Sequence, residues 1–232
     1  PEKDEKEIYP KEDQNPFIVR DFSRCILCGR CVQACNEVVV NRAISQGYRG
    51  KKSKIVTGGD KAYDDEMSEC VFCGQCVQVC PVGALTEKKA KGLGRPWETQ
   101  KIRTTCPYCG VGCQQLLHVK DGKIVKVTAV EDAQPNQGRL CVKGRFAYDF
   151  IYSKERLKTP LIREKNGEFR EASWDEALDL VATKFKEIIK KDGPDAIAGV
   201  SCARSINEDS YQMQKFFRAV IGTNNIDHCA RT

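Results

Sequence analysis

The strongest hydrophobic periodicity in the chain begins near residue 174. From there, apolar residues recur every three or four positions as far as Ile188, which is the spacing of an amphipathic helix. Ser173 and Glu176 have the spacing of a capping box at its start, and Gly193-Pro194 is typical of its end. The pattern therefore predicts a long helix between Ser173 and Gly193.

A strand–helix–strand unit is predicted to follow. Residues 196–201 form a short apolar run typical of a buried strand, and residues 225–227 begin another. Between them, Ser205 and Glu208 have capping-box spacing and open a second helix, which Gly222 ends. This order predicts the start of a parallel α/β sheet. Because so short a parallel sheet leaves apolar faces uncovered, we expect the chain to be part of a longer protein.

Alternating apolar and polar residues predict two hairpins earlier in the chain. One covers residues 161–172 and turns at Asn166-Gly167. The other pairs residues 115–119 with residues 123–127.

Two segments lack such patterns. Residues 1–16 are polar and contain three prolines, so we expect an extended arm there. Residues 89–103 are basic and contain two glycines and a proline, a composition typical of a linker.

Fourteen cysteines in 232 residues separate this chain from an ordinary globular domain. In a small secreted protein they would indicate disulfides. Here they lie in groups two and three residues apart, a spacing poor for bridging and well suited to a shared metal centre. The grouping favours a reducing compartment, so we expect a cytoplasmic protein. No run of about 18 apolar residues is present, and no membrane span is predicted.

Two cysteine runs, one in residues 25–35 and one in residues 70–80, repeat the spacing Cys-x2-Cys-x2-Cys-x3-Cys of two-cluster ferredoxins. In that arrangement three cysteines of each run hold one [4Fe-4S] cluster, and the fourth, one turn into a helix, faces the other cluster. Gly29 and Gly74 permit the tight turn between ligands. The predicted ligands of one cluster are Cys25, Cys28, Cys31 and Cys80, and those of the other are Cys35, Cys70, Cys73 and Cys76.

Zinc is the main alternative to iron. It takes four thiolates as two Cys-x2-Cys pairs from separate hairpins, which the two runs do not match, so iron–sulfur clusters are favoured there. A third group is less diagnostic, and spacing alone leaves zinc as a competitor for it. Its members are Cys106, Cys109 and Cys113, with Cys141 brought back to them by the predicted hairpin of residues 115–127.

The remaining cysteines and histidines stand outside these groups. Cys202 ends the predicted strand 196–201, where we interpret it as a small buried apolar residue, and Cys229 lies near the C-terminal end. His118 and His228 are not at ligand spacing, and we interpret both as structural or exposed.

The formal net charge of +6 needs correction for clusters. A [4Fe-4S] core held by four thiolates carries a charge of about −2, so three clusters contribute about −6. The two contributions cancel, and a nucleic-acid-binding function is therefore not predicted.

The residues around the third group resemble a known family. T-C-P-Y-C-G-V-G-C, followed by G-R-L-C-V-K-G-R-F, resembles the N-terminal cluster domain of molybdenum/tungsten bis-pterin oxidoreductases. Residues 155–178 resemble the start of their first pterin domain, and A-V-I-G-T-N-N-I-D-H-C-A-R is similar to formate dehydrogenases. N-P-F-I-V-R-D-F-S-R-C resembles the ferredoxin-like module attached to formate dehydrogenase catalytic subunits. The resemblance covers residues 15–232.

It implies an α+β chain built from three parts. These are a two-cluster ferredoxin-like module over residues 17–88, a small β-rich [4Fe-4S] domain over residues 104–160, and the truncated start of an α/β pterin-binding domain over residues 161–232.

The family's site residues carry over onto matching positions. A third [4Fe-4S] cluster falls on Cys106, Cys109, Cys113 and Cys141. Lys143 matches the family lysine between that cluster and the pterin, and it is the predicted electron relay and cofactor-binding residue. The family's catalytic selenocysteine or cysteine comes immediately after the residue that matches Thr232. No catalytic residue is therefore predicted within the chain, and we expect a selenocysteine codon to follow Thr232.

The resemblance implies the electron-transfer portion of a formate dehydrogenase. The full-length enzyme would oxidise formate or reduce carbon dioxide at a molybdenum or tungsten bis-pterin guanine dinucleotide centre, with other iron–sulfur or flavin subunits as partners. The fragment alone is expected to be inactive toward formate.

The alternative is a stand-alone iron–sulfur carrier or adaptor subunit, against which the uncovered strand–helix–strand segment argues. An [FeFe]-hydrogenase shares the front module but lacks T-C-P-Y-C-G-V-G-C. The large subunit of respiratory complex I lacks the A-V-I-G-T-N-N ending.

Overall fold

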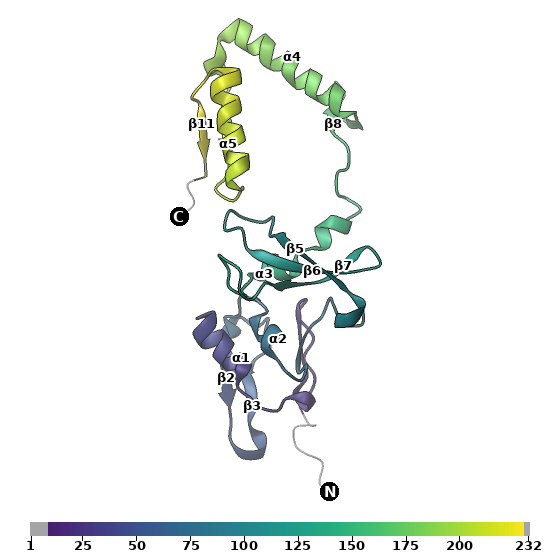
Figure 1. Cartoon of the computed structure of the whole chain (residues 1–232), viewed down its shortest axis with the longest axis vertical. Helices are drawn as coiled ribbons and strands as arrows, with labels where there is room; N and C mark the ends of the chain where they lie inside the picture. Colours follow the sequence, from purple (N-terminus) through teal and green to yellow (C-terminus); the bar gives the residue numbers. More distant parts are fainter. Residues whose placement is uncertain (1–8, 230–232) are drawn as a thin grey trace. The chain divides into compact units, whose positions relative to one another are not determined.

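The computed structural model describes residues 9–229, which form two compact units (Figure 1). Unit 1 comprises residues 9–107 and 113–148, and unit 2 comprises residues 108–112 and 149–229. The predicted ferredoxin-like module and the sheet that follows it thus belong to one unit. No helix among the described residues is long and apolar enough to span a membrane.

The two cysteine runs of unit 1 form short helices, each starting directly after a glycine. Gly29 precedes the first helix and Gly74 the second, with φ angles of +74° and +72° that a side chain would oppose. The helices are α1 (Arg30–Gln33), continued by the π-helical turn η3 (Ala34–Val38), and α2 (Gln75–Val79).

Two antiparallel strand pairs flank these helices. They are β1 (Ile18–Arg20) with β4 (Leu85–Glu87), and β2 (Ile44–Gly47) with β3 (Lys54–Thr57). The core between the elements contains ten buried residues, three of which are cysteines. Its members are Ile18, Cys31, Cys35, Ala43, Ile44, Ile55, Tyr63, Cys76, Leu85 and Phe146.

A three-stranded antiparallel sheet completes unit 1, in the order β5 (Gln100–Thr105), β6 (Gln114–Lys120) and β7 (Lys123–Ala129). The predicted hairpin between β6 and β7 is confirmed. The prediction of a linker is wrong for residues 100–103, which belong to β5. Nearly all side chains of β5 are exposed, so the strand has no apolar face for a sequence pattern to reveal. Helix α3 (Val142–Phe146) follows the sheet.

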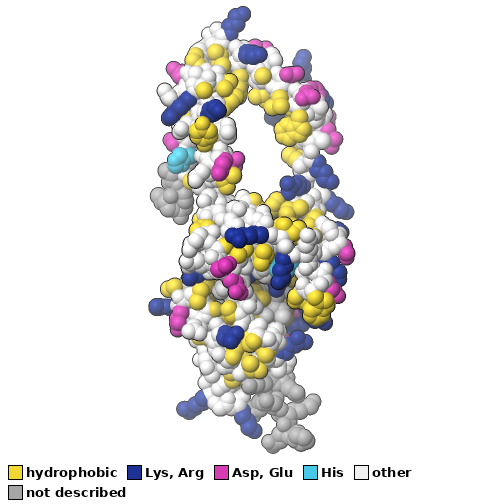
Figure 2. All heavy atoms as spheres, viewed as in Figure 1, with side chains coloured by type: hydrophobic (Ala, Val, Ile, Leu, Met, Phe, Trp, Pro, Cys, Tyr) yellow, Lys and Arg dark blue, Asp and Glu magenta, His cyan; other side chains and the backbone are white. Residues whose placement is uncertain are grey.

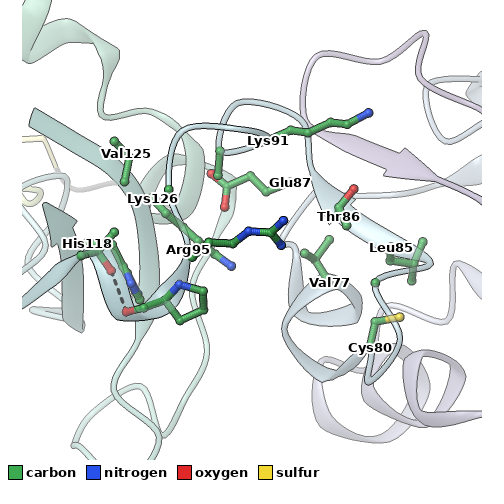
Figure 3. A pocket seen from close by; sticks show the side chains of 15 residues that line it. Val77, Cys80, Leu85, Thr86, Glu87, Lys91, Arg95, His118, Val125 and Lys126 are labelled. Atoms are coloured by element: carbon green, nitrogen blue, oxygen red, sulfur yellow. Dashed lines mark hydrogen bonds between the residues drawn. The ribbon is translucent and has the colours of Figure 1, made fainter. Parts of the chain in front are cut away.

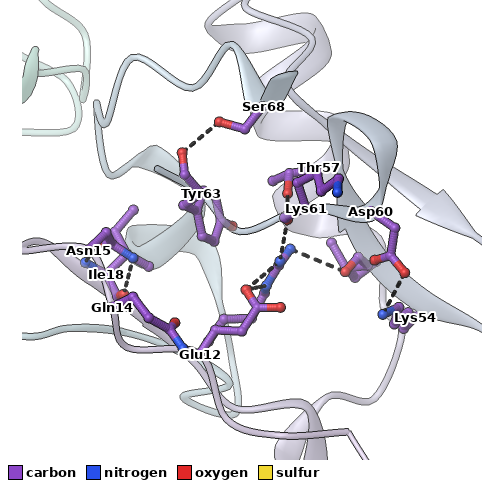
Figure 4. A network of polar contacts seen from close by, with 12 residues as sticks. Glu12, Gln14, Asn15, Ile18, Lys54, Thr57, Asp60, Lys61, Tyr63 and Ser68 are labelled. Atoms are coloured by element: carbon purple, nitrogen blue, oxygen red, sulfur yellow. Dashed lines mark hydrogen bonds and ion pairs between the residues drawn. The ribbon is translucent and has the colours of Figure 1, made fainter. Parts of the chain in front are cut away.

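Part of the predicted N-terminal arm packs against unit 1. Glu12 forms an isolated antiparallel bridge with Arg20, and the Asn15 side chain is buried and donates to the Ile18 carbonyl at 2.9 Å (Figure 4). Residues 1–8 of the predicted arm lie outside the described residues.

Unit 2 contains the predicted hairpin, formed by β8 (Leu161–Arg163) and β9 (Phe169–Glu171). Helix α4 (Trp174–Asp192) follows, and the Ser173 hydroxyl accepts the Glu176 amide at 3.1 Å, as the capping pattern predicts. The C-terminal half of α4 packs through Phe185 and Ile188 on a small core. The N-terminal half leaves apolar side chains exposed, Trp174 to 68%, and hydrophobic patches are visible on the helices of this unit (Figure 2).

The predicted parallel strands are confirmed as β10 (Gly199–Ser201) and β11 (Ile226–His228). Helix α5 (Asn207–Lys215) and the π-helical turn η10 (Phe216–Ile221) connect them, and Gly222 ends the helix at φ +88°. The second capping box is wrong. Ile206 occupies the cap position, and the Ser205 hydroxyl instead donates to the Cys202 carbonyl at 2.7 Å.

Short 3-10 turns lie between these elements. They are η2 (Phe22–Arg24), η4 (Gly50–Lys52), η5 (Gly58–Asp60), η6 (Glu66–Ser68), η7 (Pro96–Glu98), η8 (Asp149–Tyr152) and η9 (Pro194–Ala196).

Candidate metal centres

Four cysteines from both runs line one cavity of unit 1. They are Cys25, Cys28, Cys31 and Cys80, which we call the first set. Burial raises the pKa of the Cys31 thiol to about 11, and the thiols of Cys25, Cys28 and Cys80 contribute to this rise. Cys28 is exposed, whereas Cys31 is buried. The structure thus brings Cys80 of the second run together with three cysteines of the first run.

In the other four cysteines of the runs, Cys73 contributes to a raised pKa at each of the remaining three thiols. These four are Cys35, Cys70, Cys73 and Cys76, which we call the second set. Burial raises the pKa of the Cys70 thiol to about 11, with smaller contributions from Cys73 and Cys35. The pKa of Cys76 is raised by burial and then by Cys73 and Cys70. Cys35 of the first run therefore lies with three cysteines of the second.

Backbone amides point at sulfur atoms in both runs. The Cys70 Sγ accepts the Phe72 amide at 3.4 Å, and the backbone amides of Ala43 and Ile44 lower the pKa of Cys35 against the larger effect of burial. Leu27 and Phe72 occupy equivalent positions in the two runs, directly before the second cysteine, and both have left-handed backbones with φ of +56° and +50°. Alternation of right- and left-handed residues turns successive amides toward one point, as is common at anion and iron–sulfur sites. Donor type and amide direction both fit a cluster with four thiolate ligands.

Two buried arginines lie near the second set, and sequence reasoning missed both. Arg145 is 2% exposed, and its Nε donates to the Cys73 carbonyl at 2.7 Å. Arg20 is 3% exposed and stacks over the Tyr63 ring at 4.7 Å, and the Tyr63 hydroxyl lies 4.0 Å from the Cys76 Sγ. Buried cations offset the net negative charge that four thiolates give a [4Fe-4S] centre. Both arginines lie within segments that resemble the family, Arg20 in N-P-F-I-V-R-D-F-S-R-C and Arg145 in G-R-L-C-V-K-G-R-F, but neither segment indicated that the side chain is buried.

The third set was predicted to comprise Cys106, Cys109, Cys113 and Cys141. Three of these lie in unit 1. The Cys106 amide donates to the Cys113 carbonyl at 2.8 Å, and a Cβ added at Gly144, three residues after Cys141, would lie 3.5 Å from the Cys106 Sγ. Cys109 lies on the 108–112 loop, which groups with unit 2. Within residues 9–229, no three His, Cys, Asp or Glu side chains form a site for a single metal ion.

Helix α3 connects the third set to the second. It begins directly after Cys141, and its last two residues pack on Gly74, beside the second set. A Cβ at Gly74 would lie 2.3 Å from the Arg145 Cδ and 2.9 Å from the Phe146 Cζ, so only glycine permits this approach. Lys143, the predicted relay, is an exposed residue and the second residue of α3.

The two histidines take no part in these sets. His118 lies on β6, where its Nε2 contacts the Thr128 hydroxyl at 2.9 Å, and burial lowers its pKa. His228 is exposed on β11, with its Nδ1 3.2 Å from the Cys229 carbonyl.

A buried carboxyl group lies in a pocket beside the first set. Glu87 is 4% exposed, and its Oε1 has no hydrogen-bond partner among the described residues. Cys80 lines the same pocket, and the Glu87, Arg95 and Lys126 side chains are directed into it (Figure 3). Burial raises the pKa of Glu87 to about 7, although Lys126 and Arg145 oppose the rise. No sequence pattern had indicated this residue.

The raised pKa of Glu87 predicts a pH-dependent stability. The folded state favours the neutral carboxyl, so its stabilisation is full below the ordinary pKa of 4.5 and is lost as pH rises through about 7. We expect Glu87→Gln to increase the free energy of unfolding above pH 7, by up to about 3 kcal/mol. The measurement is denaturant unfolding of both proteins at pH 6 and pH 8, with the exposed Glu131→Gln as control. If the difference in the free energy of unfolding between Glu87→Gln and the unaltered protein is no larger at pH 8 than at pH 6, the raised pKa of Glu87 is wrong.

Comparison with known proteins covers almost the whole chain. The molybdopterin oxidoreductase Fe4S4 domain matches residues 99–153, and the molybdopterin oxidoreductase family matches residues 156–232. Residues 15–86 match the ferredoxin-like domain of NADH-quinone oxidoreductase subunit 3.

Full-length relatives give the same result. The chain is 38% identical over 261 residues to the "probable oxidoreductase YjgC" of Bacillus subtilis, covering 96% of this chain and 26% of that protein. It is 39% identical over 262 residues to a "putative formate dehydrogenase" of Staphylococcus aureus, covering 97% of this chain and 26% of that protein. The chain thus spans about a quarter of the length of these relatives. It belongs to the molybdopterin oxidoreductase family and carries iron–sulfur domains of that family.

Proposed function

We propose that this chain is the iron–sulfur electron-transfer portion of a formate dehydrogenase. The observation that carries the proposal is the division of the two cysteine runs into two sets of four, each drawn from both runs. A [4Fe-4S] cluster on such a set supplies one-electron redox chemistry. Twelve cysteines are proposed to hold three clusters: the first, second and third sets defined above.

The chain holds the first two sets in fixed proximity. Cys31 and Cys35 lie on the continuous helical segment formed by α1 and η3, yet they belong to different sets. Cys76 lies within α2 and Cys80 directly follows it, and these two residues also belong to different sets. Each of these two helical segments therefore supplies one ligand to the first set and one to the second set, so a movement of either segment displaces ligands of both sets.

The sets also have an order. Helix α3 connects Cys141 of the third set to the Gly74 turn of the second set, and Arg145 fixes this contact through its bond to the Cys73 carbonyl. The first set contains the exposed Cys28. The proposed order is third, second, first, with the first set facing an electron-accepting partner, for which iron–sulfur or flavin subunits are the proposed class.

Formate as the substrate is supported by the name of the Staphylococcus aureus relative. We propose that the whole enzyme interconverts formate and carbon dioxide at a molybdenum or tungsten bis-pterin centre in the cytoplasm. Residues 156–232 supply the part of the chain that matches molybdopterin oxidoreductases. We further propose that the selenocysteine or cysteine ligand of the metal follows Thr232.

Formate is expected to reduce the clusters of the full-length enzyme. Anaerobic oxidised enzyme mixed with formate should lose visible absorbance and gain the electron paramagnetic resonance signals of reduced [4Fe-4S] centres. Acetate, a carboxylate with no hydrogen on its carboxyl carbon, is the control. If dithionite reduces the clusters and formate does not, the assignment of formate as the substrate is wrong.

The same measurement of cluster reduction by formate also tests the proposed role of Lys143. If Lys143 is the relay, Lys143→Ala should slow cluster reduction by formate and leave iron content unchanged, because a cation between two anionic centres is lost. The exposed Lys154→Ala is the matched control for removing one surface charge. Equal reduction rates in both variants would reject the relay role.

A further inference from the structure

Two cysteines outside the three sets lie side by side in unit 2. Strands β10 and β11 pair in parallel, with Gly199 opposite Ile226 and Ser201 opposite His228. Continuing this register by one residue places Cys202 opposite Cys229. Their Sγ atoms are 3.7 Å apart.

This geometry is close to that of a disulfide. Neighbouring strands are about 4.8 Å apart, and disulfide-bonded cysteines have Cα atoms about 4.4–6.8 Å apart. The sulfur atoms need to approach from 3.7 Å to about 2.05 Å. Side-chain rotation can supply that change while the strand register is kept. The interpretation of Cys202 as a buried apolar residue is wrong, because both cysteines are exposed in this structure.

The surroundings of Cys229 favour its thiolate. Its Sγ accepts the Ala203 amide at 3.4 Å, and the Cys202 Sγ accepts the Arg204 amide at the same distance. The Ala203 amide is the largest cause of a lowered pKa at Cys229, followed by Cys202, and the Arg204 cation adds to it. The thiolate is the reactive form in thiol–disulfide exchange, so Cys229 is the expected nucleophile.

We propose that Cys202 and Cys229 are a reversible dithiol–disulfide pair. The Cys229 thiolate attacks a low-molecular-weight disulfide, forms a mixed disulfide and expels one small thiol. The Cys202 thiolate then attacks the Cys229 sulfur, forms the Cys202–Cys229 bond and expels the second small thiol. Two protein thiols are oxidised, and the small disulfide takes up their two electrons and two protons as two thiols.

The bond would tie the turn after β10 to the segment after β11. That turn, residues 202–205, packs closely on the loop that carries Cys109. A Cβ added at Gly110 would lie 3.1 Å from the Ser205 carbonyl oxygen and 3.3 Å from that of Ala203. The carboxyl ends of parallel strands are also where α/β sheets bind ligands. The pair therefore lies next to a loop that is proposed to supply a cluster ligand.

The test uses the full-length enzyme, equilibrated anaerobically in glutathione buffers of graded redox potential, acid-quenched, alkylated and digested with trypsin. Arg204 and Arg218 separate the two cysteines into peptides 192–204 and 219–231, neither of which contains another cysteine. We expect a linked pair of these peptides, whose ratio to the alkylated forms changes about tenfold for each 30 mV. Cys202→Ser should abolish the linked pair and leave Cys229 as a glutathione mixed disulfide.

Two results would overturn the proposal. One is the absence of linked peptides across the whole range of potentials. The other is independent glutathionylation of both cysteines in the unaltered enzyme. Iron content is measured in parallel, and it should not change with the state of the pair, since neither cysteine belongs to a ligand set.

Discussion

Removing iron and sulfide is expected to unfold residues 17–88. Three of the ten buried core residues here are cysteines, so the proposed clusters occupy the space that apolar side chains fill in other domains. The helices α1 and α2 have four and five residues, far below the length at which a helix is stable by itself. Structural zinc sites with four protein ligands supply on the order of 10 kcal/mol of folding free energy, which exceeds the net stability of many small domains, and a cluster held by four thiolates is expected to stabilise the fold in the same way.

Hydrogen exchange followed by mass spectrometry localises the effect. After chelation under oxidising conditions, amides in residues 17–88 should lose protection, whereas those in α4 and α5 should keep theirs. A sample carried through the same steps and then reconstituted with iron and sulfide should recover its protection. Persisting protection of β1–β4 in iron-free protein would show that the side chains alone stabilise this part.

A pair of double substitutions should separate the crossed ligand sets from sequential ones. Cys25→Ala with Cys80→Ala removes two ligands from the first set only. Cys25→Ala with Cys35→Ala removes one ligand from each of the first and second sets. With about twelve irons in the unaltered protein, we expect about eight irons in the first variant and about four in the second.

Both variants replace two cysteines with alanine, so a difference in their iron contents reflects which cysteines are removed and not how many. Sequential sets, with Cys25 and Cys35 on one cluster, predict the reverse order of iron contents. The measurement is iron and acid-labile sulfide per chain after anaerobic purification, combined with spin quantification of the reduced protein. Equal iron contents in the two variants would contradict the assignment of Cys80 and Cys35 to opposite sets.

The sequence predicted the local elements of this protein better than its long-range contacts. Cysteine spacing identified all twelve candidate ligands, and capping and turn residues located α4 and both hairpins. The residues that make up each of these patterns lie within a few positions of one another, so the patterns can be recognised in the sequence without knowledge of the fold.

The missed residues depend on contacts across the chain. Arg145 and Cys73 are 72 residues apart, and the role of the arginine appears only when α3 packs on the Gly74 turn. Glu87 is part of a strand whose pattern gives no sign that its carboxyl is buried. Ser205 shows the opposite error, since a correct local spacing was overridden by its bond to the Cys202 carbonyl.

The ion pair between Glu12 and Arg20 has a consequence for dissecting the protein into domains. The Arg20 Nη2 lies 2.5 Å from the Glu12 Oε2, and the arginine side chain also donates to the Ile55 carbonyl at 3.3 Å. The match to the ferredoxin-like family begins at residue 15, which excludes Glu12. A recombinant domain cut at that boundary leaves the buried Arg20 guanidinium without its carboxylate, which is expected to lower the stability of the fragment. A recombinant domain that is meant to keep this ion pair therefore needs to include Glu12.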